Sequence, residues 1–269
     1  MTTTPTTGST GLGLPFAAFG AGPPLLALPG LTARHTTPGS FEIRTLPAPD
    51  RLAEAFRVTV LQRRPGLPPG TTMGDLASDA AAAVRDDLGG GPVPVLGVST
   101  GGAVALQLAL DHPGLVSRLV LVCSAARLGE DGRRRQRRLA ELTRAGRPRA
   151  AWAQIGTPLA ATPLGRAVMT AVCWLGGGPT GDDARDLLAT IEAEDGFDVE
   201  ARLAELTVPT LVVGGGRDGF YGDRIAATAR GIPGARLVLA PRAGHMTAAS
   251  DTAVQRAVVA FLTGTDGAA

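Results

Sequence analysis

A serine between two glycines has the clearest chemical potential in this chain. Ser99 lies in Gly97-Val98-Ser99-Thr100-Gly101, after a short apolar run and before a helix-like run rich in Ala, Val and Leu. The five-residue pattern alone is a weak signal, and its flanks strengthen it. A turn from strand to helix holds such a serine in a strained backbone conformation with its hydroxyl exposed, and the glycines avoid clashes there. The sequence therefore predicts that Ser99 is a nucleophile.

A serine nucleophile needs a base to take its proton, and the chain has three histidines. His112 ends the helix that begins after Ser99, roughly 15 Å away by helix rise, which is too far. His35 lies in the loop after Gly30 and is interpreted mainly as a solvated residue. His245 follows the last predicted strand, where the base belongs in a Ser–acid–His chain order. We therefore expect His245 to be the base.

The base needs an acid to orient it. Asp218 lies just past a buried strand predicted over residues 208–213, and ligand sites of open parallel sheets form at such strand ends. Taken alone, Asp218 is also explained as an ordinary turn residue. Glu130 and Asp131, after the strand predicted over residues 116–123, are the alternative acids. Asp218 is the preferred candidate because its position matches those of the serine and the histidine.

Acyl chemistry also needs two backbone N–H donors for a negatively charged intermediate. The Thr100 amide follows the serine at a helix N-terminus, where the helix dipole favours negative charge. The second candidate is the Leu31 amide in Pro29-Gly30-Leu31, since Gly30 lets the backbone approach the substrate. An ordinary Pro-Gly turn is the alternative interpretation of this loop.

Strand and helix patterns alternate along the chain, which indicates an α/β fold with a mostly parallel sheet and helices on both faces. Four segments follow from the pattern: a disordered tail over residues 1–10, a first core part over 11–128, a helical cap over 129–200 and a second core part over 201–269. Strands are expected over residues 14–19, 24–28, 57–61, 93–96, 116–123, 208–213 and 235–240. Helices are expected over residues 50–56, 73–88, 221–230 and 250–262.

Composition excludes several function classes. All 26 basic residues are arginines, so a phosphate-binding-loop lysine and a pyridoxal Schiff base are impossible. No Gly-rich dinucleotide motif follows the first strand, and no His or Cys pair has metal-ligand spacing, so we expect no cofactor and no metal. Cys123 and Cys173 form no disulfide framework. The apolar N-terminal region has no basic segment before it and is broken by prolines, so we expect no membrane span and a cytoplasmic protein.

The predicted cap contains a run of arginines that includes Arg134 and Arg138. A solvated helix face explains it, and recognition of a phosphate-bearing acyl donor is the alternative hypothesis. Aromatic residues do not interleave with the arginines, which argues against nucleic acid binding. Met169, Trp174 and Phe220 are candidate contacts for a small-molecule acyl substrate, with packing inside the cap as the alternative.

The elbow around Ser99, together with Asp218 and Gly244-His245, resembles the α/β-hydrolase family, in its branch with a serine nucleophile and a helical cap. Many members have His-Gly where this chain has Pro29-Gly30, but the donor there is a backbone amide. The resemblance implies a roughly eight-stranded sheet and a cofactor-independent hydrolase that cleaves a carboxylic ester, thioester or lactone through an acyl-enzyme. Acyl transfer, carbon–carbon hydrolysis and perhydrolysis on the same triad stay open, as does a ligand-binding protein of this fold without catalysis.

Overall fold

The centre of the protein is an eight-stranded sheet, seen in a computed structural model that describes residues 4–265. The strands lie in the order β1-β2-β4-β3-β5-β6-β7-β8. Their bounds are β1 (Thr6–Ser9), β2 (Pro15–Phe19), β3 (Pro24–Leu28), β4 (Arg57–Leu61), β5 (Val93–Val98), β6 (Val116–Val122), β7 (Thr210–Gly215) and β8 (Arg236–Ala240). Strand β2 pairs antiparallel with β1 and β4, and all other pairs are parallel. The mostly parallel α/β sheet predicted from the sequence is confirmed.

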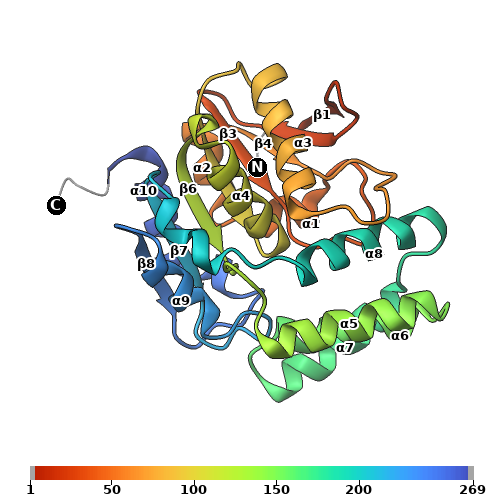
Figure 1. Ribbon diagram of the computed structural model, residues 1–269. Coiled ribbons are helices and arrows are strands. Elements are labelled where there is room, and N and C mark those ends of the chain that lie inside the picture. Colours follow the sequence, from red (N-terminus) through yellow and green to blue (C-terminus); the bar gives the residue numbers. More distant parts are fainter. Residues whose placement is uncertain (1–3, 266–269) are drawn as a thin grey trace.

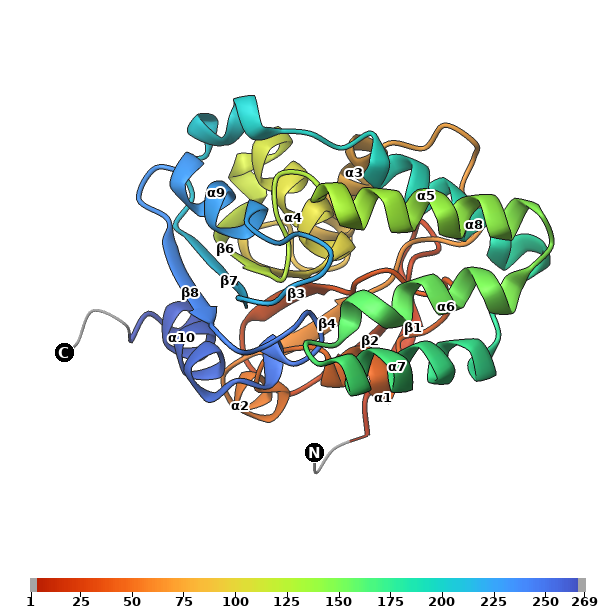
Figure 2. The ribbon, with the colours of Figure 1, turned by 90° about the horizontal axis from the view of Figure 1, so that it is seen from below.

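Helices cover both faces of this sheet (Figures 1 and 2). One face packs against α3 (Met73–Asp86), α4 (Thr100–Asp111) and α9 (Arg224–Gly231), and the other against α2 (Pro49–Ala55) and α10 (Thr252–Thr263). Successive strand residues alternate between these two cores: Val95 lies in the first and Leu96 in the second. Continuous apolar strands are therefore required, because both of their faces are buried.

The predicted disordered tail over residues 1–10 is wrong where the structure describes it. Strand β1 pairs with β2 from Thr6 opposite Ala18 to Ser9 opposite Pro15. The Thr-rich run favours extended backbone, and the exposed edge of β2 supplies the main-chain partners. Residues 1–3 of the predicted tail lie outside the described residues.

Four helices are inserted between β6 and β7: α5 (Glu130–Arg144), α6 (Pro148–Leu159), α7 (Pro163–Gly176) and α8 (Gly181–Asp195). They stand together at one side of the sheet and form the helical cap (Figures 1 and 2). A short helix, α1 (Ser40–Arg44), lies between β3 and β4, where the sequence predicts only a loop. Short 3-10 turns occur at Pro113–Leu115, Glu200–Glu205 and Ala248–Ser250. Among residues 4–265, no helix combines the length and the apolar character that crossing a bilayer requires.

Candidate active site

The residues predicted to carry chemistry meet at the carboxyl ends of the parallel strands. Ser99 directly follows β5, Asp218 lies in the loop after β7, and His245 lies in the loop after β8. Parallel strands end at a common edge of the sheet, so loops far apart in the sequence converge there.

Ser99 has a strained backbone conformation. Its φ of 53° and ψ of −123° lie in a region that residues with a side chain rarely adopt. The turn is tight enough to require glycine on both sides. A Cβ on Gly97 would lie 2.4 Å from the Gly101 carbonyl oxygen, and a Cβ on Gly101 would lie 2.2 Å from the Leu28 carbonyl oxygen. Backbone crowding therefore explains both glycines of the pentapeptide.

The structure brings the serine, the histidine and the aspartate into one hydrogen-bonded chain. The Nδ1 atom of His245 lies 2.7 Å from Oδ2 of Asp218, and its Nε2 atom lies 3.0 Å from Oγ of Ser99. An ionised Asp218 can only accept a hydrogen bond, so Nδ1 carries the proton. The Nε2 atom is then free to accept the proton of the Ser99 hydroxyl.

Asp218 is held as a buried carboxylate. Its Oδ1 atom accepts hydrogen bonds from the Phe220 and Tyr221 amides at 2.8 and 2.9 Å. Burial raises the pKa of Asp218, but the facing His245 and the two amides outweigh it, so the pKa lies below its usual value. Asp218 is therefore charged at neutral pH and fixes the orientation of the imidazole.

The other predicted acids and histidines lie away from this chain of hydrogen bonds. Asp131 pairs with Arg134 on the surface of α5. His112 lies at the end of α4 and contacts Arg85. The expectation that His35 is a solvated loop residue is wrong, because its side chain is buried between the segment after β4 and helix α8. Burial and the neighbouring positive charge of Arg63 lower the pKa of His35 to about 3.

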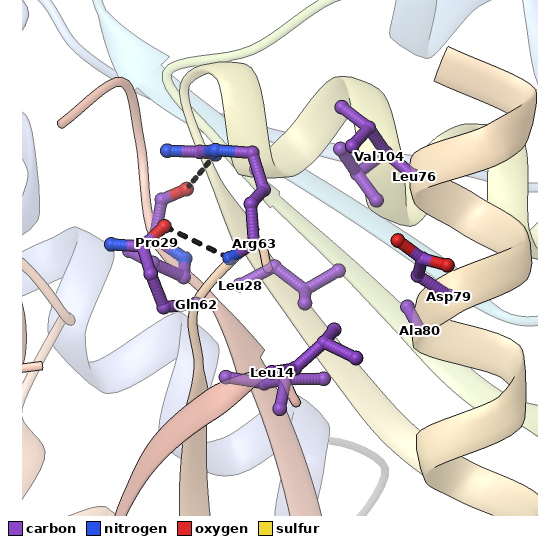
Figure 3. Close-up of a pocket in the computed structure, with 11 residues that line it drawn as sticks. Leu14, Leu28, Pro29, Gln62, Arg63, Leu76, Asp79, Ala80 and Val104 are labelled. Carbon is purple, nitrogen blue, oxygen red and sulfur yellow. Dashed lines mark hydrogen bonds between the residues drawn. The ribbon is translucent and has the colours of Figure 1, made fainter. Parts of the chain in front are cut away.

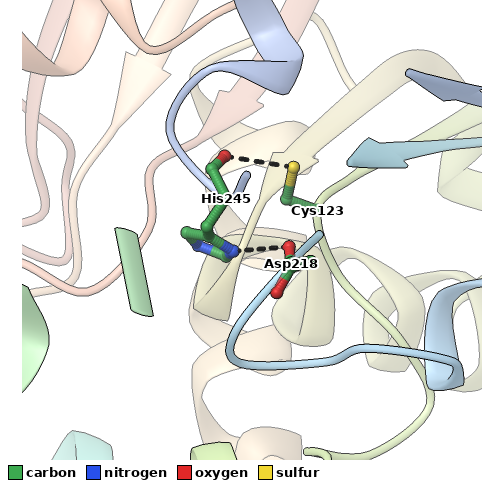
Figure 4. Close-up of side chains that lie close together, drawn as sticks. All are labelled: Cys123, Asp218 and His245. Carbon is green, nitrogen blue, oxygen red and sulfur yellow. Dashed lines mark hydrogen bonds and ion pairs between the residues drawn. The ribbon is translucent and has the colours of Figure 1, made fainter. Parts of the chain in front are cut away.

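Cys123 lies beside Asp218 and His245, and the three side chains offer metal-ligand atoms within 4.8 Å of one another (Figure 4). Their hydrogen bonds already explain the cluster. The Cys123 thiol donates to the His245 carbonyl oxygen at 3.3 Å, and Nδ1 of His245 donates to Asp218. Burial raises the pKa of Cys123 well above its usual value, and the charge of Asp218 adds to this shift. The protonated thiol supports the histidine loop, and its chemistry does not suit a metal ligand.

The two candidate donor amides border the same space as Ser99. Gly30 approaches the serine so closely that a Cβ there would lie 3.2 Å from the Ser99 Cβ. Leu31 and Thr100 both line the cavity above the serine. Within residues 4–265, neither amide donates a hydrogen bond to the protein. Both donors are thus available to a bound group.

A mainly apolar cavity of about 330 Å³ opens above Ser99 and His245. Met169 of α7 and Phe220 line it, as the sequence analysis expected of them. Trp174 does not line it and instead lies under the Arg149 guanidinium, 5.2 Å from the ring centre. Val172 faces the cavity. Trp174 comes two positions later in α7, so its side chain points to the opposite side of the helix. The aromatic residue that lines the cavity from the cap is Trp152.

The arginines of α5 lie outside this cavity. Most of them pair with acidic side chains, in the pairs Arg133–Asp195, Arg134–Asp131, Arg137–Asp195, Arg138–Glu141 and Arg144–Glu192. These pairs are the expected pattern of a solvated helix face.

The sequence analysis missed a buried polar group next to the serine. Glu194 of α8 is 1% exposed and accepts hydrogen bonds from Thr100, Gln136 and Tyr221. The Tyr221 ring stacks on His245 with 5.9 Å between the ring centres. Glu194 stands among other acidic residues in the sequence, so helical spacing gave no sign that it is buried.

Comparison with known proteins places the chain among enzymes of one family. A model of the alpha/beta hydrolase family matches residues 25–258. The pimeloyl-(acyl-carrier protein) methyl ester esterase of Neisseria meningitidis serogroup C is 32% identical over 185 residues, which cover 64% of this chain and 68% of that protein. Among solved structures, the enol-lactonase of Burkholderia xenovorans LB400 has a TM-score of 0.77 at 22% identity, covering 96% of this chain and 100% of the other. A hydrolase of Pseudomonas aeruginosa PA01 has a TM-score of 0.71 at 26% identity, with 97% and 99% covered. The chain belongs to the alpha/beta hydrolase family and is an enzyme of the hydrolase type.

Proposed function

We propose that this protein is a cofactor-independent serine hydrolase that cleaves a small-molecule carboxylic ester, thioester or lactone. The observation that carries the proposal is the chain of hydrogen bonds from Ser99 through His245 to Asp218. The serine has the strained conformation of a nucleophile at a strand–helix turn, and an apolar cavity large enough for an acyl group lies above it.

In the proposed first step, Oγ of Ser99 attacks the substrate carbonyl carbon and His245 Nε2 takes the hydroxyl proton. The carbonyl oxygen becomes an oxyanion, which the Leu31 and Thr100 amides stabilise. Collapse of this intermediate breaks the bond to the alcohol or thiol, which leaves with the proton from His245. In the case of a lactone, the leaving alcohol stays attached to the acyl group.

In the second step, His245 takes a proton from water, and the hydroxide attacks the acyl-enzyme. The bond to Ser99 breaks, the carboxylic acid is released, and the serine recovers its proton. Asp218 holds the imidazole in the required tautomer and stabilises its positive charge throughout. The apolar lining from Trp152, Met169 and Phe220 favours a hydrocarbon acyl group over a charged one.

The test is the Ser99→Ala variant. We expect it to lower kcat/KM for p-nitrophenyl esters by about 10⁴-fold or more, because the acyl-enzyme can no longer form, while the thermal unfolding temperature stays close to that of the wild type. A fluorophosphonate should label the wild type at Ser99 and leave the variant unlabelled. Near-normal turnover by the variant, or a wild type that resists labelling, would reject the proposal in favour of a ligand-binding protein.

A panel of p-nitrophenyl esters from acetate to long acyl chains measures the acyl preference of the cavity. Adding alcohols or thiols as acceptors in the same assay separates hydrolysis from acyl transfer.

A second substrate class has two observations in its favour. Arg134, Arg135 and Arg138 of α5 line a surface hollow together with Asp131 and Gln154. The name of the Neisseria relative gives its substrate as an ester borne by an acyl-carrier protein. A phosphate-bearing acyl donor is therefore the alternative substrate. Its turnover should fall at high salt and in an Arg134→Gln/Arg138→Gln variant, whereas turnover of small esters should not. Equal turnover of the phosphate-bearing donor in both tests rejects this alternative.

A further inference from the structure

Two buried charges flank the amides that would bind the oxyanion, and the proposed mechanism uses neither of them. Arg63, two residues after β4, is 7% exposed, and Glu194 of α8 is 1% exposed. Burying a charged group costs free energy unless it is paired and hydrogen-bonded, so the partners of these two groups show what each one fixes.

Arg63 fixes the loop that contains the Leu31 amide, and Figure 3 shows its hydrogen bond to Pro29 in that loop. Its Nη2 atom donates to the Gly30 carbonyl at 2.8 Å, and its Nη1 atom donates to the Pro29 carbonyl at 3.3 Å. Its Nε atom donates to Nε2 of the neutral His35 at 3.3 Å. The guanidinium thus holds the two carbonyls that precede the Leu31 amide. Burial lowers the pKa of Arg63 to about 10, so the group is still charged at neutral pH.

Glu194 fixes the other donor, Thr100. Its Oε2 atom accepts from the Thr100 hydroxyl at 2.9 Å and from the Gln136 side-chain amide at 2.8 Å. Its Oε1 atom accepts from the Tyr221 hydroxyl at 2.7 Å. All three partners donate, which is the arrangement that suits an ionised carboxylate.

The two charges also balance each other beside the serine. A carboxylate alone near this position would oppose a developing oxyanion. Arg63 attracts Glu194 electrostatically, and the N-terminus of α4, where Thr100 is the first residue, adds partial positive charge. The pair can therefore hold both amides rigidly with little net negative charge at the oxyanion position.

We propose that Glu194 and Arg63 are positioning residues for the oxyanion hole, with Glu194 fixing Thr100 and Arg63 fixing the Pro29–Leu31 loop. This inference rests on the proposed function and goes beyond it. It gives helix α8 of the cap a part in catalysis, because the carboxylate that orients one donor comes from that helix and not from the sheet.

The test compares Glu194→Gln with Glu192→Gln, a matched control on the same helix whose exposed side chain pairs with Arg144. We expect Glu194→Gln to lower kcat for a p-nitrophenyl ester by about 10- to 100-fold with KM changed by less than about threefold, because only transition-state binding is affected. Glu192→Gln should keep the wild-type kcat.

A second measurement separates positioning from a loss of folded enzyme. An alkyl trifluoromethyl ketone forms a hemiketal oxyanion with Ser99, whereas the matching secondary alcohol cannot. Affinity of Glu194→Gln for the ketone should fall in parallel with kcat, while affinity for the alcohol should not change. If Glu194→Gln does not fold, Thr100→Val removes the same hydrogen bond from the other side, and Thr100→Ser, which keeps the hydroxyl, should restore kcat.

Arg63 has its own variant, Arg63→Lys, which keeps the charge but cannot hold both loop carbonyls. It should show the same loss of kcat and of ketone affinity. Wild-type kcat in Glu194→Gln or Thr100→Val would overturn the inference, as would equal losses of ketone and alcohol affinity. If one of these results overturns the inference while Ser99→Ala is inactive, the proposed function still holds. A wild type that fluorophosphonate does not label would reject both the proposed function and this inference.

Discussion

Helices α7 and α8 belong to the same insertion between β6 and β7 but are held in opposite ways. Helix α8 buries three polar side chains, those of Asp186, Thr190 and Glu194, and each one bonds to a partner outside the helix. Helix α7 buries Cys173 alone, and its apolar side chains at Leu164, Val168, Val172 and Leu175 are more than half exposed.

The difference shows that buried hydrogen bonds, together with the apolar contacts of Ala189 and Ala193, attach α8 to the sheet domain. Buried polar groups must find hydrogen-bond partners, so the three side chains of α8 define one position for that helix. The apolar surface of α7 carries no such requirement. Helix α7 can therefore shape the cavity through Met169 and Val172, while α8 connects the cap to the catalytic groups.

The largest effect on stability is expected at Asp186, and its absence would contradict the comparison of α8 with α7. Its two carboxylate oxygens accept from the Leu67 amide at 2.7 Å and from the Gly66 amide at 3.0 Å, and these amides belong to the segment after β4. Asp186→Asn places an amide N–H₂ group against one of these donors. We expect the free energy of unfolding to fall by about 2 to 4 kcal/mol, measured by urea denaturation.

The matched control is Asp182→Asn on the same helix, where the carboxylate is exposed and pairs with Arg185. This variant should unfold within about 0.5 kcal/mol of the wild type. Similar losses for the two variants would mean that burial of Asp186 does not anchor α8.

A smaller loss in the free energy of unfolding is expected at acidic pH, and His35 is its cause. This imidazole faces Arg63, Asp186 and Thr190, and its pKa is lowered from 6.5 to about 3 in the folded protein. Between these two values the unfolded chain binds a proton that the folded chain excludes, so folding becomes less favourable as the pH falls. The free energy of unfolding should be about 2 kcal/mol lower at pH 5 than at pH 7.5 from this group alone.

Urea titrations at the two pH values measure this dependence, and amide hydrogen exchange locates it. The His35→Gln variant should lose most of the pH dependence, while His112→Gln should keep it. Exchange in acid should rise in α8 before it rises in α4. A wild-type slope retained in His35→Gln would show that another group causes the acid sensitivity.

The comparison also explains which parts of the molecule the sequence could predict. The sheet and the meeting of Ser99, Asp218 and His245 follow from apolar strands and from the strand ends where loops converge. The role of Glu194 could not be predicted, since Glu192 and Asp195 beside it are similar residues and only packing decides which one is buried. Trp174 was misplaced because the apolar residues of α7 lie both at the cavity and on the exposed surface, so hydrophobicity alone does not identify the inner face.

The smallest effect is expected on the outer surface of α7. Leu164 is 76% exposed and Val168 is 51% exposed, so their side chains lose little contact with the protein when they are shortened. We expect Leu164→Ala and Val168→Ala to change the free energy of unfolding by less than about 0.5 kcal/mol, measured by the same urea titration. Losses above about 2 kcal/mol would mean that this surface is covered in solution. The contrast between α7 and α8 would then hold only for the isolated chain, because contact with another molecule would anchor α7 as well.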